Sequence, residues 1–228
     1  MILYFPTRGR NMAVGYSFFS FFIYSFTSIF IIMNPIGLVP LFYIWTSESE
    51  KTEKIELLRK SAIAVMLTLL TFALFGGSIF KFFGITLDSF KVAGGILMLK
   101  IAWDMLHAQV SKTRHNLKDD EEPISLEDIA VVPMAIPLLA GPGTITTSII
   151  LMEHSITTYD TLIIMFSIIL ATLISVVILY LSDNIARILR VSGIKAIVRI
   201  MGLILAAISI EIISSGVFGL IKSAGLMY

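Results

Sequence analysis

Six long apolar stretches, each close to the length needed to cross a lipid bilayer, restrict how this chain can fold more than any other feature. The hydrocarbon core of a bilayer requires roughly 20 consecutive apolar residues per helix. Short polar connections separate the stretches, which cover Gly15 to Trp45, Ser61 to Phe80, Phe90 to Leu106, Ile129 to Met152, Thr161 to Leu181 and Ala196 to Leu220. The pattern predicts an all-α membrane protein with six transmembrane segments.

The composition supports a membrane location and excludes several functions. Hydrophobic residues make up 57% of the chain and charged residues 14%, with a net charge of +1, whereas about a quarter of a soluble domain is charged. Without a dense block of lysine and arginine, we expect no nucleic-acid partner. The chain has no cysteine, which excludes disulfides, thiolate metal sites and thiol catalysis. Since the histidines lack metal-site spacing and no H-E-x-x-H or G-x-S-x-G motif occurs, we expect no metal, no cofactor and no enzymatic activity.

The distribution of positive charge predicts the orientation in the membrane. The connections after the first, third and fifth segments hold eleven Lys and Arg residues, and the opposite side holds five. Because cytoplasmic loops are enriched in these residues, we expect a multi-pass protein of the cell (cytoplasmic) membrane with both termini extracellular. Arg8 and Arg10 precede an apolar run that is too long for a signal peptide, so we expect a retained first helix, with Met12 as an alternative start.

A weak internal repeat relates the two halves of the chain. At an offset of 107 residues, without a gap, Pro35 falls on Pro142, Ala64 on Ala171, Leu74 on Leu181, Gly95 on Gly202 and Asp104 on Glu211. Each half contains three segments, an odd number, so the second half must enter the membrane from the opposite side. We therefore predict two inverted three-helix repeats, residues 1–110 and 128–228, joined by a charged cytoplasmic loop at 111–127, a plan shared by many secondary transporters.

Helix-breaking residues interrupt the first and fourth segments. The first is about 30 residues long, or about 45 Å as one helix, against a hydrocarbon core of about 30 Å. Proline removes a backbone donor and disfavours a helical conformation in the residue before it. Breaks are expected at Asn34-Pro35 and at Gly141-Pro142-Gly143, with further prolines at 40, 133 and 137. We expect both segments to be discontinuous and to line an enclosed cavity or water path, with a simple proline kink as the alternative.

The half-helices that begin after the two breaks predict a binding site. The free N–H groups at a helix start attract a carboxylate, and the free carbonyls before a break suit a cation or an ammonium. A zwitterionic amino acid carries both charges. Threonine hydroxyls and an asparagine amide would add polar contacts, and glycines would leave room for a small ligand. The candidate substrate-binding residues are Asn34, Pro35, Gly37, Gly141, Pro142, Gly143, Thr144 and Thr147, with a further hydroxyl at Thr146.

Three of the charged residues within the apolar stretches are candidates for a role inside the membrane. Lys100 and Asp104 are spaced i,i+4 in the third segment, and Glu211 lies well inside the last. A carboxylate at that depth costs roughly 2.5 kcal/mol or more unless it is paired or protonated. Two interpretations stay open: the three residues couple transport to a proton or another cation, or they form a structural ion cluster that joins the third and sixth segments.

Four motifs together resemble the MarC family of integral membrane proteins over essentially the entire chain: NPIGLVPLF, PLLAGPGTI, FKVAGGI and GIKAIVRIMGLIL. The resemblance implies a six-helix inner-membrane transporter of small neutral amino acids, such as glycine and alanine, driven by a gradient of protons or Na+. The motif positions are Asn34, Pro35, Gly37 and Gly141 to Thr144. The expected partners are the amino acid, the coupling cation and membrane lipid. An exporter of other metabolites or drugs and a non-transporting membrane scaffold remain as alternatives, and the oligomeric state is not predicted.

Overall fold

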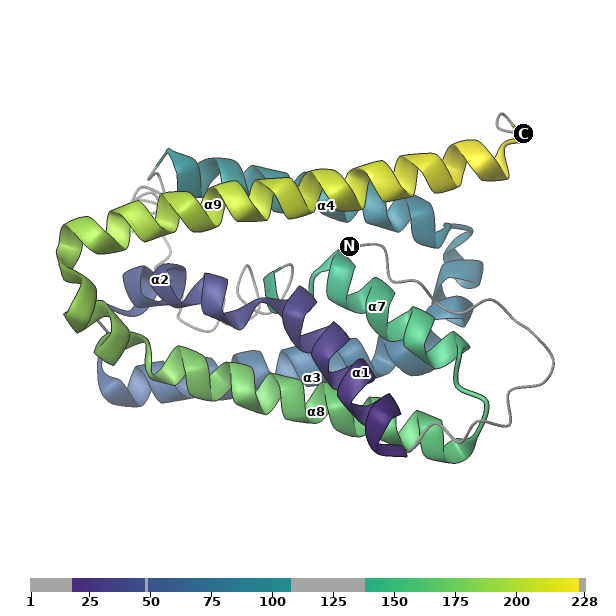
Figure 1. Cartoon of the computed structure of the whole chain (residues 1–228), viewed down its shortest axis with the longest axis horizontal. Helices are drawn as coiled ribbons and strands as arrows, with labels where there is room; N and C mark the ends of the chain where they lie inside the picture. Colours follow the sequence, from purple (N-terminus) through teal and green to yellow (C-terminus); the bar gives the residue numbers. More distant parts are fainter. Residues whose placement is uncertain (1–17, 48, 108–137, 226–228) are drawn as a thin grey trace, which may run out of the picture.

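The computed structural model describes residues 18–47, 49–107 and 138–225, and all regular structure in these residues is helical. The predicted all-α class is confirmed. With the labels of Figure 1, the helices are α1 (Phe18–Met33), α2 (Pro35–Thr46), α3 (Lys51–Phe83), α4 (Leu87–Leu106), α7 (Pro142–Glu153), α8 (Thr158–Tyr180) and α9 (Ser182–Ser223). The predicted charged loop at 111–127 lies outside the described residues.

The helices form three layers, as Figure 1 shows. Helices α4 and α9 lie side by side along one face, and α3 and α8 lie along the opposite face. Between them lie α1, α2 and α7, and both α2 and α7 contact each outer layer. The two helices that begin after the predicted breaks therefore occupy the middle of the molecule.

Four of the described helical stretches are long and apolar enough to cross a membrane: Phe18–Thr46, Lys51–Phe83, Thr158–Tyr180 and Ala196–Ser223. Helix α7 has only 12 residues, and α4 carries four charged residues among its 20. These four stretches agree with an integral multi-pass membrane protein, while six crossings stay a prediction.

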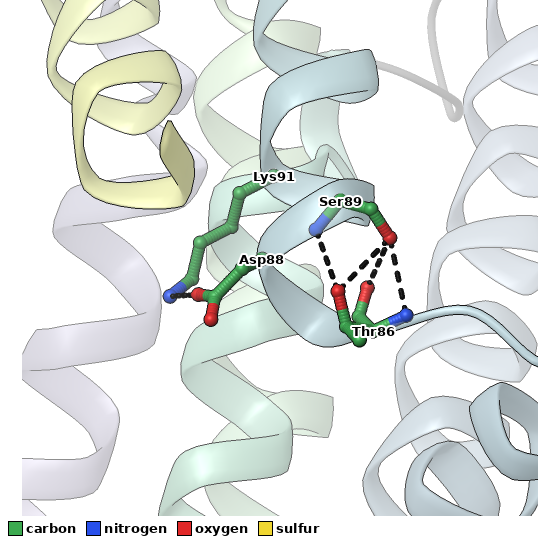
Figure 2. Close-up of polar contacts among 4 residues, drawn as sticks. All are labelled: Thr86, Asp88, Ser89 and Lys91. Atoms are coloured by element: carbon green, nitrogen blue, oxygen red, sulfur yellow. Dashed lines mark hydrogen bonds and ion pairs between the residues drawn. The ribbon is translucent and has the colours of Figure 1, made fainter. Parts of the chain in front are cut away.

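Polar capping residues set where several helices begin. Thr86 and Ser89 form a reciprocal capping box at the start of α4, shown in Figure 2: the Ser89 N–H donates to Thr86 Oγ1 at 3.0 Å and the Thr86 N–H donates to Ser89 Oγ at 3.1 Å. One turn on, Lys91 Nζ forms an ion pair with Asp88 Oδ1 at 3.0 Å. Equivalent boxes begin α3 and α8. As a result α3 begins ten residues before the apolar run that predicted it.

Two glycines bring the backbones of α4 and α9 into close contact. A Cβ added to Gly95 would lie 3.2 Å from the carbonyl oxygen of Ser209 and 3.3 Å from the amide nitrogen of Ile213. A Cβ at Gly202 would lie 3.1 Å from both the Ala102 oxygen and the Leu106 nitrogen. Small residues at such crossings let membrane helices pack closely. The glycines therefore set the spacing of this layer.

Candidate functional site

The first predicted break is a single residue, Asn34. Helix α1 ends at Met33 and α2 begins at Pro35, with Asn34 in the left-handed conformation at φ 46° and ψ 53°. Asparagine is one of the few non-glycine residues that adopt this conformation readily, and proline suits the first helical position, where its missing N–H is not needed. The side-chain oxygen of Asn34 accepts a hydrogen bond from the Gly37 N–H at 3.3 Å. Asn34 therefore caps the helix that it starts.

The space beside Gly37 is filled by protein atoms. A Cβ at this position would lie 2.5 Å from Asn34 Nδ2 and 2.7 Å from the terminal methyl carbon of Met201 on α9. We expected the missing side chain to leave room for a ligand, but that room is taken by the Asn34 cap and by Met201. Gly37 thus permits the packing of the break itself.

The second break differs because its N-cap residue is a glycine, which has no side chain to cap the helix. Helix α7 begins at Pro142 with Gly141 as its N-cap, in extended backbone at φ −71° and ψ 172°. The first N–H groups of any α-helix lack intrahelical partners. Pro142 has no N–H, so Gly143 and Thr144 carry the first donors of α7. This start has the better geometry for a carboxylate.

The two breaks lie against one another. A Cβ added to Gly143 would lie 3.0 Å from Ile32 Cγ2 in the last turn of α1, and 3.1 Å from Ile212 Cδ1 on α9. The ring of Pro142 fills the space beside Gly94 on α4. The structure therefore brings the first turn of α7 next to the last turn before Asn34, as a shared site requires. Residues Pro133 and Pro137 lie outside the described residues.

Buried hydroxyl groups lie on α7 and in the middle of α1, and two of them lack a partner. Thr144 is 1% exposed, Thr146 is 7% exposed and Thr147 is half-buried. Among the described residues, Thr146 Oγ1 on α7 and Ser25 Oγ on α1 are buried without a hydrogen-bond partner. Leaving such a group unsatisfied costs about 1–3 kcal/mol. These two hydroxyls can therefore contribute to binding a polar ligand, an ion or water. Sequence reasoning missed Ser25, because α1 also carries Ser20 and Ser28 and the sequence does not set one of these serines apart.

The three charged residues predicted to couple transport do not form a cluster. Lys100 and Glu211 are exposed and Asp104 is half-buried. No ion pair joins any two of them in the part of the chain that the structure describes. In the single chain, the Glu211 side chain lies on the outer surface of α9. A role in ion coupling stays a prediction for all three.

A polar cavity of about 570 Å³ lies at the other end of α2, and sequence reasoning missed it. Its lining includes Tyr43, Thr46, Ser47, Lys54, Tyr180 and Asp183. Lys54 is 4% exposed; its Nζ lies 2.7 Å from Asp183 Oδ2 and donates to Ser182 Oγ at 2.9 Å. The available signal was its position on the buried face of α3 with Leu57, Leu58 and Ser61, at helical spacing. In the sequence, Lys54 contributed only to the count of positive residues that predicts the orientation in the membrane.

No group of three or more His, Asp or Glu side chains is placed to hold a metal ion within residues 18–47, 49–107 and 138–225. The polar groups described above are hydroxyls, backbone N–H groups, one amide and one ion pair.

Comparison with known proteins gives consistent results across the chain. Residues 19–221 match the family described as MarC family integral membrane protein. A UPF0056 membrane protein of Methanocaldococcus jannaschii is 49% identical over 207 residues, which is 90% of this chain and 90% of the relative. One of Pyrococcus abyssi is 42% identical, covering 85% and 92%. The UPF0056 membrane protein YhcE of Escherichia coli is 34% identical, covering 90% and 96%. No solved structure matches the chain.

Proposed function

Because this chain belongs to the MarC family of integral membrane proteins, we propose that it is an ion-coupled secondary transporter of small neutral amino acids such as glycine and alanine. The substrate binds where α1, α2 and α7 meet, near the middle of the bilayer. Two inverted repeats, residues 1–110 and 128–228, then alternate its access between the two sides of the membrane.

One observation carries the proposal: α2 and α7 are matched half-helices. Each has 12 residues, each begins with proline, and their bounds, Pro35–Thr46 and Pro142–Glu153, correspond residue for residue at the offset of 107. Twelve residues span about 18 Å, too short for a hydrocarbon core of about 30 Å. Discontinuous helices in corresponding places of two repeats are typical of the binding sites of secondary transporters.

Further contacts support a two-fold relation between the halves. At the same offset, the capping box of α3, formed by Glu50 and Glu53, corresponds to that of α8, formed by Thr157 and Asp160.

The glycine contacts between α4 and α9 follow the same rule. Gly95 meets Ser209 and Ile213 on α9, whereas Gly202 meets Ala102 and Leu106 on α4. At the offset of 107, each of these residues corresponds to one in the other contact. Exchanging the halves thus maps the contact onto itself, as a two-fold axis between inverted repeats requires.

The helix ends suggest how an amino acid binds. Its carboxylate accepts hydrogen bonds from the uncapped first turn of α7, where the helix dipole also favours negative charge. Its ammonium binds the free carbonyls at the end of α1 and the Asn34 side-chain oxygen. Thr146 Oγ1 and Ser25 Oγ are unpaired hydroxyls on the same two helices. Close packing at Gly37 and Gly143 favours a small substrate.

Alanine uptake by two proline variants, one in α7 and one in α2, tests the proposal. Pro142→Ala adds a backbone donor and allows helix through the second break, so we expect the initial rate of labelled alanine uptake into proteoliposomes to fall at least tenfold. Pro40→Ala is the matched control, because Pro40 lies inside α2 and not at a break. Equal uptake by both variants, with equal amounts inserted, would remove the breaks from the mechanism.

Ion coupling is tested separately. We propose that Glu211 or Asp104 carries the coupling charge, with Lys100 as the neighbouring cation. Glu211→Gln and Asp104→Asn should then abolish the stimulation of uptake by an imposed proton or Na+ gradient while leaving equilibration of the substrate. Full gradient stimulation in both variants would exclude these carboxylates as coupling groups.

A further inference from the structure

We infer that the cavity at the C-terminal end of α2 is a second amino-acid site, in which Lys54 binds the carboxylate and Asp183 binds the ammonium of a zwitterion. The inference rests on the proposed function, since it places an access site for the same substrate class on one side of the central site.

The cavity lies between the two halves of the chain. Tyr43 and Thr46 line it from α2, Ser47 from the C-cap of α2, Lys54 from α3, and Tyr180 and Asp183 from the junction of α8 and α9. Its volume is about 570 Å³, and many of its lining residues carry hydroxyl groups. Such a lining suits a small polar solute.

Lys54 is a buried charge held by few groups. Its Nζ contacts Asp183 at 2.7 Å and Ser182 Oγ at 2.9 Å, and lies 5.2 Å from the centre of the Phe42 ring. A buried ammonium is stable only while it is paired. Asp183, in contrast, is 48% exposed and faces the cavity. The Lys54 charge therefore requires an anionic partner, and its present partner is half-exposed at the edge of the cavity.

A zwitterion can replace this ion pair without leaving either charge unpaired. When its carboxylate binds Lys54 Nζ, its ammonium can bind the Asp183 carboxylate, so both protein charges keep an opposite charge beside them. A simple carboxylate would bring no cation to replace Lys54 beside Asp183, and a simple amine would leave Lys54 without an anion. Lys51 also lines the cavity, as a further cation. The pair thus favours zwitterions over singly charged solutes.

The corresponding place in the other half is closed by apolar packing. At the offset of 107, Phe42 corresponds to Ile149, Asp183 to Gly76 and Lys54 to Thr161. There Ile149 packs so closely on Gly76 that a Cβ on the glycine would lie 2.7 Å from Ile149 Cδ1. The structure is therefore hollow and charged at the Lys54 end and packed at the equivalent position, as expected of a transporter that is open to one side.

Protection of single cysteines tests the inference directly, because the natural chain has none. Ser47→Cys and Asn184→Cys place a thiol in the lining from two different helices. Thr158→Cys is the matched control, exposed at the far end of α8 from Tyr180. We expect millimolar alanine or glycine to slow labelling of the two cavity thiols by a charged methanethiosulfonate at least threefold, without affecting the control.

Two comparisons make the assignment falsifiable. Propionate and ethylamine, which each carry one of the two charges, should not protect the cavity thiols. The double variant Lys54→Met with Asp183→Asn, made in the Ser47→Cys background, should insert normally and lose protection. Equal protection by propionate, protection that persists in the double variant, or no protection by alanine would each overturn the inference. The propionate comparison leaves Lys54 and Asp183 unchanged, so it holds even where the double variant does not insert.

The test also separates this inference from the proposed function. Protection by alanine without any uptake into proteoliposomes would leave the site and remove transport. Uptake of alanine without protection would leave transport and remove the site.

Discussion

Individual residues at the first break act through packing as much as through chemistry. Gly37 is enclosed by the Asn34 amide and by Met201, and Asn34 adopts a left-handed conformation in which its side-chain oxygen accepts a hydrogen bond from the Gly37 N–H. The identity of both residues follows from the geometry of the break. The sequence indicated that a break occurs here, but the atoms that fill it come from α9, about 160 residues away.

Gly37→Ala should destabilise the protein, since the added methyl would displace the Asn34 cap and Met201. Inserting a methyl into a packed site costs about 1–3 kcal/mol. Gly77→Ala is the matched control, because no atom lies within 4 Å of a Cβ there and alanine favours helix by up to about 1 kcal/mol. Thermal unfolding in detergent, followed by the helical signal in circular dichroism, should show a lower midpoint for the first variant alone. A midpoint for Gly37→Ala at or above that of Gly77→Ala would contradict the packing described here.

The Lys54–Asp183 pair makes a second prediction at this scale. Asp183→Asn leaves a buried ammonium without its anion, so we expect it to lower the unfolding midpoint more than the double variant with Lys54→Met, in which neither charge remains. The same unfolding measurement on both proteins checks it. A double variant less stable than Asp183→Asn would show that Lys54 stabilises the fold mainly through its other contacts.

Among the elements, α4 and α9 show most clearly what sequence patterns could and could not predict. The apolar runs indicated both helices, and the glycine positions indicated close packing. One of the two open interpretations placed their charged residues in an ion cluster between the helices, yet Lys100 and Glu211 are exposed. Apolar runs around a whole helix do not tell which face meets a neighbour, so the orientation of these side chains could not be predicted. The cavity beside Lys54 was missed because it forms between two pairs of helices, α2 with α3 and α8 with α9, that are more than 70 residues apart in sequence.

Gly95→Val and Gly202→Val should disturb the α4–α9 layer by similar amounts. Each adds atoms against a backbone that lies 3.1 to 3.3 Å from a Cβ, and overpacking of this kind costs about 1–3 kcal/mol. Ala207→Val, at an exposed position of α9, is the control. We expect the thermal unfolding midpoint to fall for both glycine variants and to stay unchanged for the control. A large effect at only one glycine would argue against equivalent contacts.

For the whole molecule, the inverted repeat predicts that α3 and α8 begin on opposite sides of the membrane. Ser49→Cys and Thr157→Cys place one thiol just before each helix. In oriented membrane vesicles, an impermeant thiol reagent should label one of them from outside and the other only after permeabilisation. Labelling of both from the same side would exclude inverted repeats.

The central claim, that this MarC family protein moves small neutral amino acids against a gradient by ion coupling, is tested most directly by transport itself. Purified protein is reconstituted into liposomes, and labelled alanine is supplied with an imposed proton or Na+ gradient. We predict accumulation above the external concentration, which is lost when an ionophore dissipates the gradient. Alanine and glycine uptake no faster than in protein-free liposomes, under either gradient, would contradict the account.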